Sequence, residues 1–237
     1  SLDALAAKSV RFDNHYAASF PTMPARADFL TGRWTMSFMK WAPLPMSEVV
    51  IGELLSNKGI HTSAIVDTPF YLRNAMGYDR GFRTFTEIPG QLHHPVIPGT
   101  PLAAGVTKDT MNAREPAMPW HFESDCFAPR TFIESMRWLN YHYKEDFFLY
   151  IDTWDPHESW DAPDYYTELY WPNYDGEIID PTYGHWQDMP GMTEEKVKKA
   201  LAAYWGEVTM VDTWVGRLLR QLENMNLMEK TAIIFST

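Results

Sequence analysis

A hydroxyl, a cation and the signals of a helix start lie together near the beginning of the chain. Thr22 precedes Pro24 by two positions and Arg26 by four, and Gly32 follows Arg26. Proline suits the first turn of a helix and glycine suits the left-handed residue after its end, so the pattern predicts a helix that starts near Thr22. The unpaired N–H groups at the start of this helix favour an anion near Thr22. Residues four positions apart, such as Thr22 and Arg26, share one face of a helix. Thr22 is therefore a candidate nucleophile, and Arg26 is a candidate for binding phosphate or sulfate oxygens. The same residues also fit an ordinary N-cap and a solvated arginine, and spacing alone favours that plainer interpretation.

A second polar cluster follows an apolar run. Residues 147–151 have the length and bulk of a central parallel strand, and Asp155, His157, Glu158 and Trp160 come soon after it. Open α/β sheets hold their ligands at the carboxyl ends of strands. The two acids favour the protonated imidazole that a general acid requires, which makes His157 a candidate acid. A lone histidine is more often structural, and the residues by themselves favour that alternative.

Asp67 occupies the corresponding place after the apolar residues 60–66. Its carboxylate can either contact a substrate or anchor its own loop. An aspartate before Thr68 and Pro69 is ordinary turn chemistry, which favours the anchor.

The elements that must position these residues alternate between helix and strand. Amphipathic periodicity and capping residues predict helices, and short apolar runs predict strands. The alternation predicts an α/β fold: a three-layer sandwich with a mostly parallel sheet and helices on both faces. Residues 86–125 are rich in proline and lack periodicity, which indicates a long surface excursion. The expected helices are residues 2–9, 22–31, 47–59, 129–143 and 193–224, and the expected strands are residues 60–66, 147–151 and 231–236.

Composition limits the partners of the chain. It has 237 residues and a net charge of −11, which argues against nucleic acid or an anionic membrane surface as the main partner. No stretch approaches the ~20 apolar residues of a membrane span. The single Cys126 excludes an internal disulfide and leaves a cytoplasmic or periplasmic location open. Without an initiator Met or a signal peptide, and ending directly after an apolar run, the chain is expected to be an internal fragment.

Two motifs resemble a known family. The run Pro-x-Arg-x-x-x-Leu-Thr-Gly-Arg, from Pro24 to Arg33, resembles the signature of the sulfatase family within the alkaline phosphatase superfamily. The run Asp-Pro-His-Glu-Ser-Trp around His157 is similar to the family's His-x-Pro-aromatic segment, with Ser159 where proline is usual. The resemblance covers nearly the whole chain. It implies a single partial catalytic domain over residues 1–237 that lacks the first strand and the C-terminal part.

The resemblance also implies an activity for the full-length protein: metal-dependent hydrolysis of a sulfate or phosphate ester of a small molecule or glycan. Residues 1–237 alone are expected to be inactive. Thr22 would be nucleophile and metal ligand, Arg26 would neutralise the transferring group, and His157 would assist the leaving oxygen. The metal is expected to be Ca, Mg, Mn or Zn, held mainly by ligands outside the chain. The substrate-binding residues are expected to be Asp67, Asp155 and Trp160.

Thr22 departs from the family pattern. Most sulfatases carry a Cys or Ser here that is converted to formylglycine, and that conversion does not accept threonine. Other branches of the superfamily use an unmodified threonine on phosphoesters, so the departure favours phosphate or phosphonate esters. The alternative is a catalytically inactive sulfatase-like protein that binds a glycan.

Overall fold

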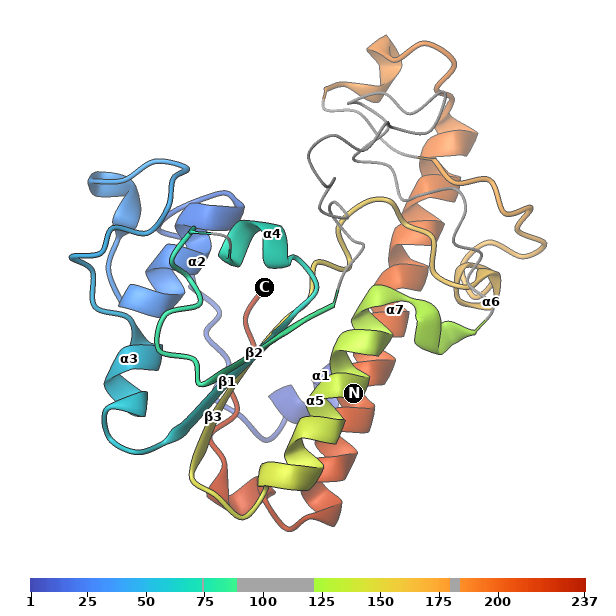
Figure 1. The fold of residues 1–237 in the computed structure, drawn as a ribbon. Helices are drawn as coiled ribbons and strands as arrows, with labels where there is room; N and C mark the ends of the chain where they lie inside the picture. Colours follow the sequence, from blue (N-terminus) through green and yellow to red (C-terminus); the bar gives the residue numbers. More distant parts are fainter. Residues whose placement is uncertain (74, 89–121, 180–183) are drawn as a thin grey trace, which may run out of the picture.

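The computed structural model describes residues 1–73, 75–88, 122–179 and 184–237 (Figure 1). Within these residues the strands form a parallel three-stranded sheet in the order β2-β1-β3. Parallel neighbours require crossover connections, which the helices between the strands supply. The strands are β1 (His61–Val66), β2 (Thr84–Glu87) and β3 (Phe147–Asp152).

Helices cover both faces of this sheet, as Figure 1 shows. Successive side chains of a strand point to opposite faces. Accordingly, Ala64 and Val66 of β1 pack in a core with α2, whereas Ile65 packs in another core with α5 and α7. The expected three-layer α/β arrangement is therefore confirmed. The flanking helices are α2 (Thr22–Thr31), α3 (Ile51–Ser56) and α4 (Pro69–Leu72) on one face, and α5 (Phe127–His142) and α7 (Glu194–Asn224) on the other.

The helix α7 is the longest element of the described residues. The side chain of Thr193 accepts a hydrogen bond from the Lys196 backbone N–H at 3.2 Å, as expected of a helix N-cap. Its buried residues recur at helical spacing and pack against α5, which is typical of an amphipathic helix. The remaining short helices are α1 (Leu2–Ala6), α6 (Asp164–Thr167), η1 (Thr35–Ser37), η2 (Glu123–Asp125), η3 (Trp186–Asp188) and η4 (Met228–Lys230).

Most expected elements agree with the structure. Both apolar runs, residues 60–66 and 147–151, are strands to within a residue or two at their ends, and α2 ends at Gly32 with the left-handed φ of 67° that was expected. The expected helix over 47–59 is shorter, because α3 spans only Ile51–Ser56. No helix in the described ranges is long and apolar enough to cross a membrane.

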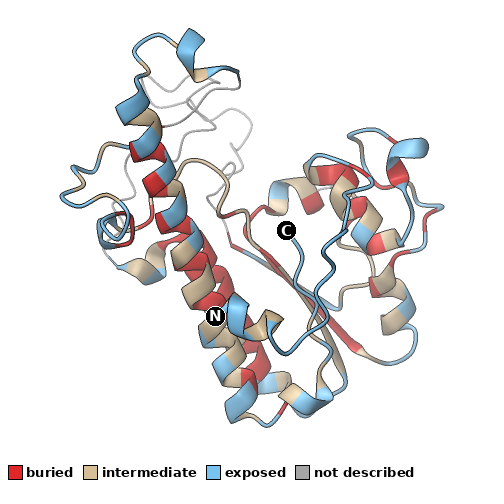
Figure 2. Ribbon diagram, turned by 180° about the vertical axis from the view of Figure 1, so that it is seen from behind, coloured by how far each residue is buried: buried red, intermediate tan, exposed pale blue. Residues whose placement is uncertain are grey.

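The expected strand at residues 231–236 is wrong. Residues 231–237 pair with no described strand, and Ile234 is 91% exposed. Figure 2 colours most of this terminal stretch as exposed. A short apolar run becomes a strand only where a sheet edge pairs with it, and no pairing is formed here. The short β2 was not expected. The surface excursion predicted for residues 86–125 falls largely on 89–121, which lie outside the described residues.

Candidate active site

Three elements meet at the carboxyl edge of the sheet. Asp67 follows β1 directly, β3 ends at Asp152, and α2 begins at Thr22. The guanidinium of Arg26 donates from Nε and Nη2 to the two carboxylate oxygens of Asp152, both at 2.6 Å. The two side chains are only 14% and 8% exposed. This bidentate pair fixes the start of α2 against the end of β3.

Asp152 holds Arg26 in its charged form. Burial by itself would lower the pKa of Arg26, but the charge of Asp152 and its hydrogen bonds raise that pKa above its ordinary value. Tyr150 also donates its hydroxyl to Asp152 at 2.7 Å. Burial, and then the charge of Asp152, raise the pKa of Tyr150 well above its ordinary value, which keeps the phenol protonated as a donor.

Thr22 lies half-buried at the first position of α2. Its carbonyl oxygen accepts a hydrogen bond from Nη1 of Arg26 at 3.2 Å. The segment before α2 is tied to the segment after it by Asp28, which accepts from the Ser19 hydroxyl at 2.9 Å and from the Thr35 hydroxyl at 2.6 Å. These contacts hold the helix entrance in place from both sides.

His157 joins the same cluster through an aromatic ring. Its imidazole lies on Trp154 with ring centroids 4.3 Å apart, and the guanidinium of Arg26 lies 5.8 Å from the centroid of that tryptophan. Nδ1 of His157 is 3.1 Å from the Glu158 carboxylate, and its side chain is 38% exposed. Tyr71 stacks on Trp154, with the two ring centroids 5.7 Å apart. A half-exposed histidine therefore lies on the same aromatic wall as the buried arginine.

Asp67 is fully buried and binds the loop after β3. It accepts hydrogen bonds from the Thr153 hydroxyl and from the Trp154 backbone N–H, each at 2.8 Å. Burial, and next the charge of Asp155, raise the pKa of Asp67 well above its ordinary value. These contacts make Asp67 a support for the loop that carries Trp154.

The other two expected substrate-binding residues also make contacts within the protein. Asp155 is 3% exposed and accepts a hydrogen bond from the Ala128 backbone N–H at the start of α5, at 3.2 Å. Trp160 donates from Nε1 to the Pro156 carbonyl at 3.1 Å. Its ring packs against that of Tyr204 of α7, with the ring centroids 5.5 Å apart. The structure thus brings Thr22, Arg26 and His157 into one connected group and places these two residues against helices.

The described residues at this edge do not by themselves fit a hard divalent cation. Such an ion takes about six oxygen ligands. Each nearby carboxylate accepts hydrogen bonds from protein donors: Asp67 from Thr153 and Trp154, Asp152 from Arg26 and Tyr150, and Asp155 from Ala128. The Thr22 hydroxyl is left as the expected ligand, and one hydroxyl is too few.

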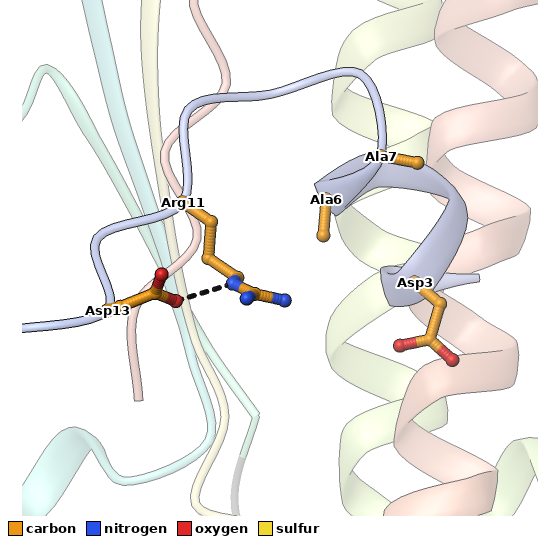
Figure 3. A pocket seen from close by; sticks show the side chains of 5 residues that line it. All are labelled: Asp3, Ala6, Ala7, Arg11 and Asp13. Atoms are coloured by element: carbon orange, nitrogen blue, oxygen red, sulfur yellow. Dashed lines mark hydrogen bonds and ion pairs between the residues drawn. The ribbon is translucent and has the colours of Figure 1, made fainter.

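Two hollows of the described surface lie elsewhere. The first, of about 400 Å³, lies between α1 and the loop that carries Arg11 and Asp13, whose exposed ion pair measures 2.7 Å (Figure 3). The second, of about 360 Å³, lies between β2 and α5. Neither is lined by Thr22, Arg26 or His157.

Sequence reasoning missed the residues that hold the candidate site together. Asp152, Trp154 and Tyr71 were not among the expected site residues. Asp152 carried a usable signal, since it directly follows an apolar run in the same way as Asp67. The ring contacts of Trp154 and Tyr71 depend on the order of the strands, which no local pattern gives.

Comparison with known proteins adds the family. The sulfatase family model matches residues 1–237. An arylsulfatase of Clostridium perfringens is 23% identical over an alignment of 287 positions, gaps included, which covers 99% of this chain and 56% of that protein. An ulvan-active sulfatase of Formosa agariphila is 23% identical over 243 residues, covering 100% of this chain and 44% of the relative.

Solved structures show the same fold. The phosphonate monoester hydrolase of Agrobacterium radiobacter matches with a TM-score of 0.71 and 21% identity, over 99% of this chain and 56% of that one. The phosphonate monoester hydrolase of Silicibacter pomeroyi matches with a TM-score of 0.65 and 20% identity, over 95% of this chain and 54% of that one. The chain spans about half the length of the relatives it matches. Because the family model matches the chain from end to end, and as the two sequence motifs predicted, the chain belongs to the sulfatase family.

Proposed function

We propose that this chain supplies the nucleophile, the anion-binding cation and the general acid of an ester hydrolase, with Thr22 as the nucleophile. The substrate class is a phosphate or phosphonate ester of a small molecule or glycan, in preference to a sulfate ester. Family membership and the fold shared with two phosphonate monoester hydrolases support an ester hydrolase. The threonine at the nucleophile position supports the preference for phosphorus.

The observation that carries the proposal is the bidentate pair between Arg26 and Asp152. It places the cation of α2 at the carboxyl end of β3, the edge where α/β sheets bind ligands. A guanidinium has more N–H donors than the three that its contacts with Asp152 and Thr22 use, so donors remain for substrate oxygens. A cation held in this way can stabilise negative charge on a transferring group without reorganising.

The reaction takes two steps in this proposal. The Thr22 hydroxyl oxygen attacks phosphorus and releases its proton to solvent. The bond from phosphorus to the leaving oxygen breaks, and the leaving oxygen takes a proton from His157, which solvent then protonates again. Water then attacks the phospho-Thr22 ester, which releases the phosphoryl product and restores the hydroxyl. A formylglycine hydrate can expel sulfate by collapsing to an aldehyde, but a threonine ester lacks that exit. Direct attack of water suits phosphorus.

A divalent ion, Ca, Mg, Mn or Zn, is part of the proposal only as an addition to these residues. When bound at Thr22 it would favour the alkoxide form of the hydroxyl. Since the nearby carboxylates bind protein donors, most of its ligands would come from residues other than those described here. Thr22, Arg26 and His157 act in this proposal through their own hydroxyl, guanidinium and imidazole groups.

Kinetics on three variants of the full-length protein that contains this chain test this proposal. Thr22→Ala should abolish turnover of an aryl phosphonate monoester and Thr22→Ser should keep part of it, because serine retains the hydroxyl. Thr31→Ala, at the other end of α2, is the matched control and should leave the rate within a few-fold. Turnover that survives Thr22→Ala would contradict the proposal, and so would a wild-type protein that binds a sulfated glycan but hydrolyses no ester.

A further inference from the structure

Two histidines and a glutamate converge at the opposite edge of the sheet. His61 is the first residue of β1, His142 is the last residue of α5, and Glu145 lies in the turn before β3. Nδ1 of His61 is 2.7 Å from one carboxylate oxygen of Glu145, and Nδ1 of His142 is 2.8 Å from the other. One ligand atom from each residue lies within 4.8 Å of the others. None of the three belongs to the candidate active site.

The backbone holds these three residues in place. The His61 N–H donates to the Asp146 carbonyl at 2.9 Å, and the Glu145 N–H donates to the His142 carbonyl at 3.0 Å. The first bond joins β1 to the turn before β3, and the second closes that turn at the end of α5. The ligand atoms therefore come from rigid elements, which a preorganised ion site requires.

We propose that His61, His142 and Glu145 form a Zn²⁺ site at the amino edge of the sheet. Two imidazole nitrogens and a carboxylate oxygen are the donors that zinc prefers, and they leave a fourth tetrahedral position for water. Calcium and magnesium prefer oxygen ligands alone. The site is separate from the expected active-site metal, because the six residues of β1 place about 20 Å between the two edges.

The ligand atoms would have to shift to bind one ion. Ligand atoms about 2.0–2.1 Å from zinc in a tetrahedron lie roughly 3.3 Å apart, whereas the three ligand atoms lie within 4.8 Å of one another and the two imidazoles contact different oxygens of Glu145. Nε2 of His61 is buried and has no hydrogen-bond partner among the described residues. The ring can therefore shift without breaking a second hydrogen bond.

The three proposed ligands differ in their exposure to solvent. His61 is 6% exposed, whereas the side chains of His142 and Glu145 are 27% and 46% exposed, so water can reach one side. Trp138 covers one side of the site. Its ring centroid lies 4.6 Å from that of His142 and 5.2 Å from that of His61.

Equilibrium dialysis of the purified protein against ZnCl₂ tests the site directly. We expect His142→Gln and Glu145→Gln each to bind one zinc equivalent per chain fewer than the wild type, with unchanged far-UV circular dichroism. Glu145 is half-exposed, so its variant keeps the test valid if His142→Gln folds poorly. His15→Gln, an exposed histidine, and Glu134→Gln, a glutamate on α5, are the matched controls and should lose none.

Two further arms separate this site from the active site. Thr22→Ala should keep this zinc equivalent, and excess MgCl₂ should not displace it. Wild-type zinc stoichiometry in both His142→Gln and Glu145→Gln would overturn the proposal, and so would a zinc equivalent that disappears in Thr22→Ala.

Discussion

In the proposed reaction, His157 is the residue whose contribution depends most on the substrate. A general acid matters most when the leaving oxygen cannot carry negative charge, and losing one costs ~10²–10⁴-fold in rate. We therefore expect His157→Ala to slow alkyl esters far more than activated aryl esters of the same phosphoryl group. The measurement is kcat over a series of leaving groups, with His15→Ala as a control at an exposed histidine. Equal slowing across the series would make His157 a binding or packing residue.

Asp67 should give stability a specific pH dependence. Its folded-state pKa is raised, first by burial and then by the charge of Asp155. The group therefore contributes stability that is fully present below its unfolded pKa of about 4 and is lost as pH rises through the folded value. We expect the wild type to lose free energy of unfolding relative to Asp67→Asn as pH rises from about 4. Urea denaturation at several pH values measures this, with Asp13→Asn as an exposed control. Parallel pH curves for the wild type and Asp67→Asn would contradict it.

At the scale of single residues, the sequence identified part of the candidate site. The spacing of Thr22 and Arg26 on one helix was predictable, because helix start signals are local. The partnership of Arg26 with Asp152, 126 positions away, was not, because it depends on which strand lies beside α2. The place of Trp154 between Arg26 and His157 depends on the same packing.

At the scale of elements, the Arg26 to Asp152 pair joins α2 to β3 inside the protein. Removing one partner of a buried ion pair leaves the other charge uncompensated and costs about 3–5 kcal/mol. Asp152→Asn should therefore lower the free energy of unfolding by about that amount in urea denaturation. The control is Asp13→Asn, which breaks the exposed pair with Arg11 and should cost about 0–1 kcal/mol. Equal, small effects of the two variants would show that the pair does not hold α2 in place.

The packing of α6 on α7 makes a second prediction about elements. A methyl group at Gly206 would lie 2.9 Å from the backbone nitrogen of Thr167, whereas one at Gly216 would meet only the side chain of Ser1. Gly206→Ala should therefore lower the free energy of unfolding of the protein by about 1–3 kcal/mol. Gly216→Ala should cost less than Gly206→Ala, because alanine favours a helix and the atoms it would meet belong to a side chain and not to the backbone. Thermal unfolding of both variants measures the contrast, and stabilisation by Gly206→Ala would refute it.

Most elements followed from local patterns, and the failures share one cause. The long helix after Thr193 and the two apolar strands carry their periodicity and caps within their own residues. Residues 231–236 and β2 depend on strand pairing instead. Residues 231–236 have the composition of a strand but pair with no described strand. The short, partly exposed β2 is a strand because it pairs with β1.

At the scale of the whole molecule, the two edges of the sheet differ in chemistry. The carboxyl edge carries the hydroxyl of Thr22, the guanidinium of Arg26 and the imidazole of His157. The amino edge carries the imidazoles of His61 and His142 with the Glu145 carboxylate. Since the net charge of these 237 residues is −11, the overall field of the chain would not attract the anionic substrate proposed above, which leaves Arg26 and any bound cation to attract it locally.

The role of Thr22 is the central claim, and a trapped intermediate tests it most directly. The protein is mixed with a phosphonate or phosphate ester, quenched rapidly in acid, digested and analysed by mass spectrometry. We expect the transferred phosphoryl or phosphonyl group on Thr22, in an amount that falls as substrate is exhausted, and none in Thr22→Ala. Substrate turnover with the group on another residue, or turnover that persists in Thr22→Ala, would contradict the account.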